Sequence, residues 1–329
     1  MTGLVYDDIY LAHGSEEHPD SPARLRAIRD HLIKVGLWDR LQHIPARPAT
    51  IDELTFVHTP KYIKSIEDLS NAGGGQADVD TVLSRDSYNA ALMAVGGCIE
   101  AGKAVAAGKV KNAFCAVRPP GHHALPNSTM GFCVFNNVAI LAKYLQYHHD
   151  VINILIIDWD IHHGNGTQEA FYDDPTALFF SMHGFPMFPG SGSRGESGTG
   201  LGRALTMNIP IYPGTDRETY LSIFRHGLRQ ITERFTPEFI LISAGFDTYK
   251  DDPVGGLGLE VSDFALLTEW VVELAREHCN ERIVSVLEGG YHLTALPLSV
   301  EKHLRVLSGI AQDATDLGVA LFEHCLNLW

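Results

Sequence analysis

Apolar residues gather in short continuous runs along this chain, and each run stops abruptly at polar or glycine-rich residues. Four of these runs are rich in β-branched or aromatic residues, and they cover residues 112–117, 151–157, 238–243 and 282–287. A strand that is apolar at every position is buried on both faces, which is typical of a parallel sheet. The pattern therefore predicts four buried parallel strands.

Segments with apolar residues at three- and four-residue spacing lie between the runs and predict amphipathic helices. They cover residues 136–149, 216–235 and 261–278. Ser262 or Asp263 is expected to cap the last helix. Strands that alternate with helices predict βαβ units and a doubly wound or three-layer α/β fold. Two glycine-rich stretches, residues 71–78 and 190–202, are expected to be flexible surface loops.

Composition narrows the classes of protein to consider. The chain has 329 residues, is 45% hydrophobic and shows no linker-like stretch, so we expect one domain over residues 1–329. Its net charge of −15, without any Lys/Arg cluster, argues against nucleic-acid binding. No secretory signal is recognisable, and no apolar run approaches the ~20 residues that span a bilayer. We therefore expect a cytoplasmic protein without a membrane partner, and a homo-oligomer is compatible with the sequence.

The five cysteines give no sign of a disulfide framework or of a cysteine zinc site. They are odd in number, widely separated and never spaced CxxC. Cys98, Cys115, Cys133, Cys279 and Cys325 are therefore expected to be ordinary buried thiols.

A polar cluster follows each of the four predicted strands. The clusters are RPPGHH (118–123), DWDIHHGNG (158–166), AGFD (244–247) and EGGY (288–291). In open parallel sheets, ligands bind beyond the carboxyl ends of the strands, where the connecting loops converge. We therefore expect parallel packing to bring the four clusters together.

Three residues of these clusters are candidate metal ligands. Asp160 and His162 are two positions apart, so in an extended segment they face the same side, and Asp247 supplies a second carboxylate from another strand end. Three protein ligands leave a position open for water and substrate, as a catalytic metal requires. Two oxygens and one imidazole suit zinc and do not exclude iron or manganese. A single DxH more often caps a helix, but that reading leaves the other clusters unexplained.

Histidine pairs occur three times, and their surroundings distinguish them. His148 and His149 end a predicted helix, where cations suit the helix dipole. His122 and His123 follow the stiff RPPG segment at a strand end, where imidazoles can transfer protons near pH 7. Tyr291 follows two glycines and can reach a site to donate to an oxyanion.

Two further residues can support the histidine pair: Asp158 can orient one imidazole or bind a second cation, and Asn165 can bond the other. His163, which points away from His162, is expected only to support its loop. These groups together predict metal-assisted hydrolysis of a carbonyl compound.

The motifs resemble, in order and over nearly the whole chain, the zinc-dependent histone deacetylase family, specifically its class II-like branch of bacterial-type histone deacetylase-like amidohydrolases. They are HPDSPARLRAI (18–28), RPPGHHA (118–124), GFCVFNN (131–137), DWDIHHGNGTQEAF (158–171), FFSMH (179–183), FPGSG (188–192), AGFD (244–247), DDPVGGL (251–257) and LEGGYHL (287–293). The resemblance implies one domain with the arginase/deacetylase fold, a three-layer α/β/α architecture around a central eight-stranded parallel sheet.

The resemblance also implies roles for individual residues. It makes Asp160, His162 and Asp247 the zinc ligands, His123 rather than His122 the principal general base and acid, and Tyr291 the group that polarises the acetyl carbonyl. Potassium is implied as a structural ion. The first potassium site comprises Asp158, Asp160, His162, Ser181 and Met182, and the second comprises Phe171, Asp174, Ala177 and Leu205. The channel for the acyl-lysine stem is lined by Gly131, Phe132, Phe188 and Val254.

Two positions bear on subclass and substrate. Asn165 stands where class I members carry Asp, as in class II-like members. Polyamine-specific relatives carry an acidic residue at the position of Val254, although Asp251 and Asp252 near the rim keep that specialisation open. Arg24 is either a structural arginine or a neighbour of an internal acetate-release path.

The implied reaction is hydrolysis of acetyl-lysine in a peptide or protein, with acetate as product. One alternative is deacetylation of small N-acetyl amines such as acetylpolyamines, which predicts a channel closed by inserted loops or by a partner subunit. Another is a non-catalytic module that binds acyl ligands or proteins, against which the complete set of chemical groups argues. Arginase chemistry on the same fold requires a two-metal cluster with more carboxylates than the sequence offers.

Overall fold

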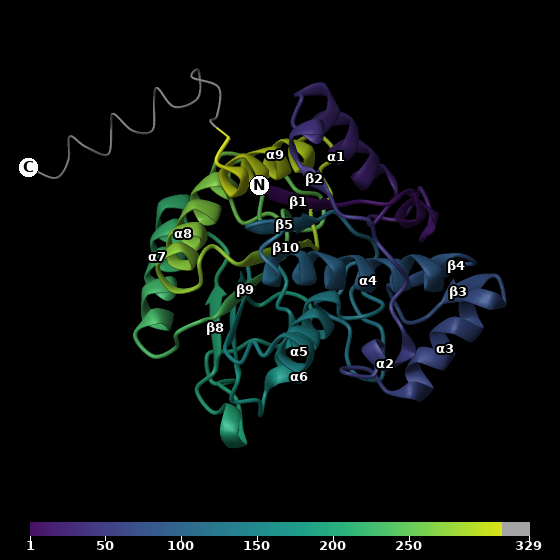
Figure 1. Cartoon of the computed structure of the whole chain (residues 1–329), viewed down its shortest axis with the longest axis horizontal. Helices are drawn as coiled ribbons and strands as arrows, with labels where there is room; N and C mark the ends of the chain where they lie inside the picture. Colours follow the sequence, from purple (N-terminus) through teal and green to yellow (C-terminus); the bar gives the residue numbers. More distant parts are fainter. Residues whose placement is uncertain (311–329) are drawn as a thin grey trace, which may run out of the picture.

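A computed structural model describes residues 1–310 of the chain, and Cys325 lies outside the described residues. Its centre is a parallel sheet in the order β2-β1-β5-β10-β9-β6-β7-β8 (Figure 1). The strands are β1 (Thr2–Val5), β2 (Gln42–His43), β5 (Asn112–Cys115), β6 (Ile154–Asp158), β7 (Ala177–Gly184), β8 (Thr206–Ile211), β9 (Phe239–Ala244) and β10 (Ile283–Leu287). The expected eight-stranded parallel sheet is confirmed.

Helices cover both faces of the sheet (Figure 1). On one face lie α4 (Ser87–Ala106), α5 (Asn137–His149) and α6 (Asn165–Phe171). On the other lie α1 (Ala23–Lys34), α7 (Arg217–Thr232), α8 (Asp263–His278) and α9 (Ala295–Ser308). Every residue of the inner strands β5, β10, β9 and β6 is buried, as their unbroken apolar sequences predicted.

A smaller unit packs against α4 and has its own apolar cluster. It comprises α2 (Ile51–Leu54), α3 (Pro60–Asn71) and the antiparallel pair β3 (Gly74–Gln76) and β4 (Val82–Ser84). Its core includes Leu54, Tyr62, Ile63, Ile66 and Leu83. This unit carries the segment that reaches the rim of the pocket described below.

The helix ends show which local signals matter. Thr50 and Glu53 form a reciprocal capping box at the start of α2, and the Asp216 carboxylate accepts the backbone N–H of Thr219 at the start of α7. The expected cap of α8 differs: Ser262 is the capping residue but makes no side-chain bond there. Asp263 instead binds Arg217, because a buried carboxylate gains more from a guanidinium than from a helix end.

The two glycine-rich stretches, which were expected to be flexible surface loops, are both held in place, whereas the cysteines and the helices among the described residues are as the composition suggested. The glycine-rich segment 71–78 forms part of the β3–β4 hairpin, while residues 190–202 are held by side chains rather than free. Among the described residues, no helix is both long and apolar enough to cross a lipid bilayer. Cys98, Cys115, Cys133 and Cys279 are free and buried, as predicted.

Candidate active site

The four polar clusters meet at one edge of the sheet because their strands are neighbours. The strand order β5-β10-β9-β6 is uninterrupted in the sheet, although these strands are far apart in sequence. Their carboxyl ends deliver the segments of His122, Tyr291, Asp247 and Asp160, respectively. The expectation that parallel packing would gather the clusters is therefore confirmed.

A compact group of three candidate metal ligands lies at this edge and is called the metal group below: Asp160, His162 and Asp247. Their ligand atoms all lie within 4.8 Å of one another, and none of the three residues is more than 9% exposed. Nδ1 of His162 lies 3.1 Å from Oδ1 of Asp160 and 3.3 Å from Oδ2 of Asp247. Backbone N–H groups orient both carboxylates: Gly289 donates to Asp160 at 2.8 Å and Ile161 to Asp247 at 2.9 Å.

The metal group is better suited to hold a metal ion than the other candidate set among the described residues. Oδ2 of Asp247 is buried without a hydrogen-bond partner, which is costly unless a cation binds there. Among the described residues, one other set, comprising His122, Cys133 and Glu288, has comparable spacing. Its carboxylate is already engaged, however, since both Glu288 oxygens accept hydrogen bonds.

The tandem histidines face the metal group and have different partners. Nδ1 of His122 donates to Oδ2 of Asp158 at 2.9 Å, whereas Nδ1 of His123 lies 2.8 Å from Oδ1 of Asn165. Burial opposes a charge on His122, but the carboxylates of Asp158 and Asp160 outweigh it and raise its pKa to about 10. Burial, reinforced by the positive charges of His122 and His162, lowers the pKa of His123 well below its usual value.

Glu288 binds the backbone of the segment that carries the tandem histidines, a role that the sequence did not reveal. One of its oxygens accepts the backbone N–H groups of Gly121 at 2.7 Å and His122 at 3.2 Å. The other accepts the Ser243 hydroxyl at 3.3 Å, and burial raises the pKa of the carboxyl to about 7. The EGGY cluster signalled a polar group here, but its contacts depend on which strands are neighbours.

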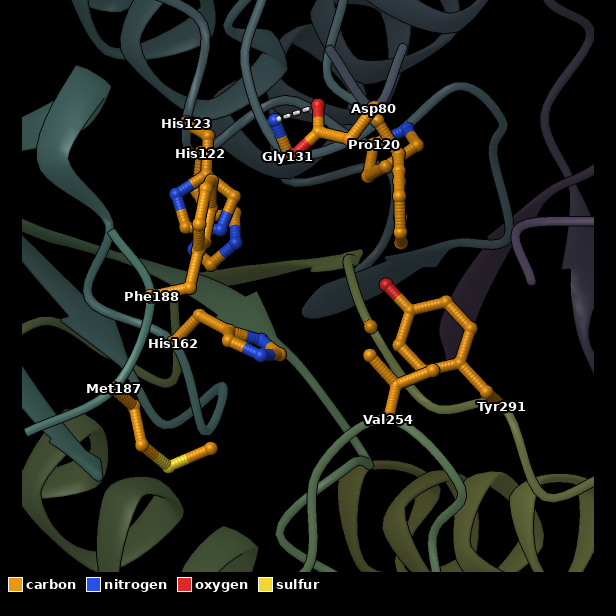
Figure 2. A pocket seen from close by; sticks show the side chains of 12 residues that line it. Asp80, Pro120, His122, His123, Gly131, His162, Met187, Phe188, Val254 and Tyr291 are labelled. Atoms are coloured by element: carbon orange, nitrogen blue, oxygen red, sulfur yellow. Dashed lines mark hydrogen bonds between the residues drawn. The ribbon is translucent and has the colours of Figure 1, made fainter. Parts of the chain in front are cut away.

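A pocket of about 340 Å³ opens onto these groups, with Tyr291 opposite the histidines (Figure 2). Its lining includes Gly131, Phe132, Phe188, Val254 and Tyr291, together with Asp80, Pro120 and Met187, which the sequence did not single out. The Phe188 ring packs on His123 at 5.2 Å between centroids, and the Phe132 ring packs on Tyr291 at 5.9 Å. Two aromatic walls thus lead to the buried polar groups.

Glycines are required at two places where the backbone approaches these side chains. Gly131 has φ of +57°, and a Cβ there would lie 2.3 Å from the His123 ring. A Cβ on Gly289 would lie 2.1 Å from Oδ2 of Asp247. A side chain at either position would displace a group of the candidate site.

Tyr291 is fixed from two directions. The guanidinium of Arg24 lies 4.8 Å from the centre of the Tyr291 ring, and its Nε donates to the carbonyl of Gly290 at 2.6 Å. Burial raises the pKa of Tyr291 well above its usual value of 10, so the phenol keeps its proton. Arg24 is fully buried and also bonded to Asp20, so it has the contacts of a structural arginine.

The residues expected at two potassium sites also lie close to one another in the fold. For the first site, Asp158 pairs with Ser181 across the β6–β7 ladder, next to Met182. For the second, Phe171 ends α6, Ala177 begins β7, and the Leu205 carbonyl accepts the backbone N–H of Phe179. The ammonium of Lys143 contacts Asp174 and lies 4.7 Å from the Phe171 ring, so a cation of the chain itself borders this second site.

One of the remaining candidates, Asp252, is placed differently from the sequence expectation. Asp252 is only 7% exposed and turns inward to backbone N–H groups, so it is not a rim charge, whereas Asp251 is exposed. His163 points away from the metal group, as expected, and contacts Ser191 and Gln168. His148 and His149 lie at the end of α5, away from the pocket.

Comparisons with known proteins agree with this geometry. A family model for the histone deacetylase domain matches residues 18–307. A probable deacetylase of Archaeoglobus fulgidus is 40% identical over 301 residues, which cover 90% of this chain and 83% of the relative. Histone deacetylase 10, chloroplastic, of Oryza sativa subsp. japonica is 35% identical over 316 residues, which cover 91% of this chain and 71% of the relative.

A human relative and a solved structure extend the comparison. Histone deacetylase 9 of Homo sapiens is 37% identical over 350 aligned residues, which cover 94% of this chain but only 34% of that protein. The crystal structure of the HDA15 HD domain has a TM-score of 0.88 and 34% identity, with 93% of this chain and 91% of that chain covered.

Proposed function

The chain belongs to the histone deacetylase family and is a metal-dependent amidohydrolase, and from this premise we propose that it hydrolyses acetyl-lysine in peptides or proteins to lysine and acetate. The observation that carries the proposal is the pocket itself. Its aromatic walls suit an acyl-lysine stem, and His162 of the metal group lies across the pocket from Tyr291 (Figure 2).

The metal we propose is zinc, which the family generally uses. Asp160, His162 and Asp247 would hold it, and the unpartnered Oδ2 of Asp247 supports this assignment. When bound, zinc supplies a Lewis acid that polarises the acyl carbonyl and makes water more acidic. Proton transfer and stabilisation of the oxyanion are assigned to side chains of the protein.

His123 is proposed as the general base, because its hydrogen bond fixes the tautomer. The amide oxygen of Asn165 can only accept, so Nδ1 of His123 carries the proton and Nε2 keeps a lone pair. His123 takes a proton from the attacking water, and the imidazolium so formed protonates the departing amine. Tyr291 donates its phenolic hydrogen to the oxygen of the tetrahedral intermediate. His122, whose Nδ1 bonds to Asp158, packs against His123 with ring centroids 3.9 Å apart and lines the same pocket.

A peptide substrate is favoured over a small N-acetyl amine. The Phe188 side chain is 41% exposed, so the outer edge of the channel wall reaches solvent instead of lying beneath an inserted loop. Val254 lines the pocket with an apolar side chain, and the inward-facing Asp252 adds no charge to the rim. Asp80, the carboxylate that does line the pocket, already accepts the Gly131 backbone N–H at 3.0 Å and the Thr81 hydroxyl at 3.1 Å.

Three further assignments are part of the proposal. The neutral Asn165 beside His123 supports a place in the class II-like branch. Potassium is proposed as a structural ion at the two groups of residues described above. Residues 1–329 are proposed to form a single catalytic domain, of which 311–329 lie outside the described residues.

The function is tested by turnover. Zinc-reconstituted protein is incubated with an acetyl-lysine peptide, a longer-acyl-lysine peptide and an acetylpolyamine, and the released acid and free amine are quantified. The acetyl-lysine peptide is expected to be the best substrate. Tyr291→Phe and His123→Ala are expected to lower kcat by about 100-fold or more, because each removes a group that acts in the transition state.

The chain supplies a matched control in its other histidine pair. His149→Ala removes an imidazole from the end of α5, outside the pocket, and is expected to leave kcat within about twofold of the parent. Absence of turnover of every substrate, or full activity of His123→Ala, would refute the proposed mechanism. Preference for the acetylpolyamine would instead establish the small-amine alternative.

A further inference from the structure

The carboxylate of Asp252 joins two segments that lie far apart in sequence. Its Oδ1 accepts the backbone N–H groups of Val254 at 3.0 Å and Gly255 at 3.1 Å. Its Oδ2 accepts those of Tyr291 at 2.7 Å and His292 at 3.1 Å, about 40 residues further along the chain. One buried side chain therefore binds four backbone groups, two from each segment.

Both segments deliver a side chain to the pocket. Val254 and Tyr291 lie next to each other on the wall opposite the histidines (Figure 2). Because Asp252 binds the backbone of each residue, it fixes the position of the apolar wall relative to the phenol. A displacement of one segment is transmitted to the other through a single carboxylate.

The segment before Tyr291 needs such an anchor. Gly289 and Gly290 precede it, and because glycine has no Cβ, this backbone is less restricted than others unless contacts hold it in the observed conformation, in which Gly290 has φ of +113°. Arg24 holds the carbonyl side of this segment, through the Gly290 and Glu288 oxygens. Asp252 holds its N–H side, so the two side chains anchor complementary backbone groups.

A surface-charge role for Asp252 does not fit its surroundings. The residue is 7% exposed, and each of its oxygens already accepts two N–H groups. The neighbouring Asp251 is exposed, with its carboxylate near the Tyr249 hydroxyl at 3.3 Å. Asp252 is thus a buried anchor for backbone groups, whereas the adjacent Asp251 carries a charge that faces solvent.

We propose that Asp252 is a positioning residue that holds Tyr291 and Val254 in one fixed arrangement, so that the phenol meets the acyl carbonyl at the depth set by the pocket wall. This inference rests on the proposed function, because it assigns Asp252 an effect on turnover that acts through Tyr291. It predicts that the effect of changing Asp252 depends on whether the Tyr291 hydroxyl is present.

The test combines Asp252→Asn with Tyr291→Phe in a double-mutant cycle on the zinc-loaded protein. Asparagine keeps the size of the side chain but replaces one accepting oxygen by an NH₂ group, which cannot accept from the two N–H groups facing it. In the parent, Asp252→Asn is expected to lower kcat by about tenfold, the scale of a displaced catalytic group. In the Tyr291→Phe background the same change is expected to lower kcat by less than about twofold, because the hydroxyl it positions is gone.

Asp251→Asn is the matched control, since it removes the same charge one residue away. It is expected to change kcat by less than about twofold in both backgrounds. Equal factors for Asp252→Asn with and without the Tyr291 hydroxyl would overturn the proposal, as would an equally large effect of Asp251→Asn.

Amide hydrogen exchange tests the anchor without using activity. Asp252→Ala, which removes both accepting oxygens, is expected to accelerate exchange in residues 253–256 and in residues 289–293 together, by about tenfold or more, whereas Asp251→Ala accelerates neither. Acceleration confined to one segment would overturn the inference. If the parent hydrolyses no acetylated substrate, the proposed function fails, and exchange still decides whether Asp252 joins the two segments. If Asp252→Asn or Asp252→Ala does not fold, Asp252→Glu is measured instead, with the same pattern expected because its longer side chain displaces both oxygens.

Discussion

At the scale of single residues, the metal group places two buried carboxylates beside each other. Asp160 and Asp247 are almost completely buried, and the His162 imidazole contacts both. Two buried carboxylates beside each other repel, and each has lost its hydration. A bound dication removes this repulsion, so occupancy of the site should contribute directly to the stability of the fold.

Metal removal is therefore expected to lower the unfolding temperature. A ligand at about 100 times its Kd stabilises the native state by about 2.7 kcal/mol, and each kcal/mol shifts the midpoint of a large domain by roughly 2–4 °C. Chelator-treated protein should unfold several degrees lower in calorimetry, and added zinc should restore the midpoint. Asp247→Asn should respond to neither treatment, because it lacks a ligand. Identical midpoints for protein with and without measured zinc would contradict this expectation.

Residue types and their positions at strand ends were sufficient to predict that the polar groups would meet, but they did not reveal Asp80, Pro120 or Met187 of the pocket lining. Asp160, His162 and Asp247 come together as expected, because alternation along an extended segment and parallel pairing are both regular. Asp252 and Glu288 escaped that reasoning, because they act on backbone N–H groups of segments distant in sequence. Almost every residue has a backbone N–H group, so the sequence does not show which of them a carboxylate binds. Only the fold shows it.

At the scale of elements, the loop between β7 and β8 shows how a glycine-rich segment is held without regular structure. The Glu196 carboxylate accepts the backbone N–H groups of Gly192 at 3.0 Å and Ser193 at 2.9 Å. It also accepts the Gln168 side-chain amide at 2.7 Å, and the Gln168 oxygen in turn accepts from Nε2 of His163 at 3.0 Å. The loop is thereby tied to α6 and to the segment of the metal ligands.

Glu196→Gln is expected to weaken substrate binding more than catalysis. The loop carries Phe188, whose ring forms one channel wall, while the groups that act on the carbonyl come from other segments. We expect KM to rise about fivefold, equivalent to about 1 kcal/mol of binding free energy, with kcat within about twofold. Glu169→Gln, an exposed position on α6, is the matched control and should change neither constant. A fall in kcat at unchanged KM would place the role of the loop in catalysis instead.

Some helices and strands could be predicted from the sequence pattern, and others could not. The predicted helix over residues 136–149 corresponds to α5, and the predicted strand over 238–243 to β9, within one residue at each end. Both have long uninterrupted patterns that tertiary contacts reinforce. The two-residue strand β2 has no periodicity to detect, and the glycine-rich β3 resembles a loop in sequence, because its strand geometry comes from pairing with β4.

At the scale of the whole molecule, the excess of acidic residues gives the protein a negative field. The chain carries 40 acidic and 25 basic side chains, and its net charge is −15 with neutral histidines. Such a field raises the local concentration of cationic ligands and repels anionic ones, and salt screens it over about 10 Å at 0.1 M. A peptide substrate would feel this field through the residues that flank its acetyl-lysine.

The ionic-strength dependence of kcat/KM should therefore depend on the sequence of the peptide. For an acetyl-lysine flanked by lysines, kcat/KM is expected to fall about threefold to tenfold between low and high salt, because screening removes the attraction. With flanking glutamates in the same peptide, it is expected to rise or stay constant. The measurement is initial rate against sodium chloride concentration for the two peptides. Parallel salt dependence of both would show that the field of the protein does not reach the substrate.

The position of β10 in the sheet has a consequence for a chain that is still being synthesised. This strand lies between β5 and β9, yet it is the last of the described strands to leave the ribosome. Until it arrives, β5 with its tandem histidines and β6 with β9 and their metal ligands belong to two unjoined half-sheets, and Tyr291 has not been translated. Co-translational folding can build each half, but neither half is a hydrolase. A nascent chain therefore remains inactive as an amidohydrolase until the last of the described strands closes the sheet.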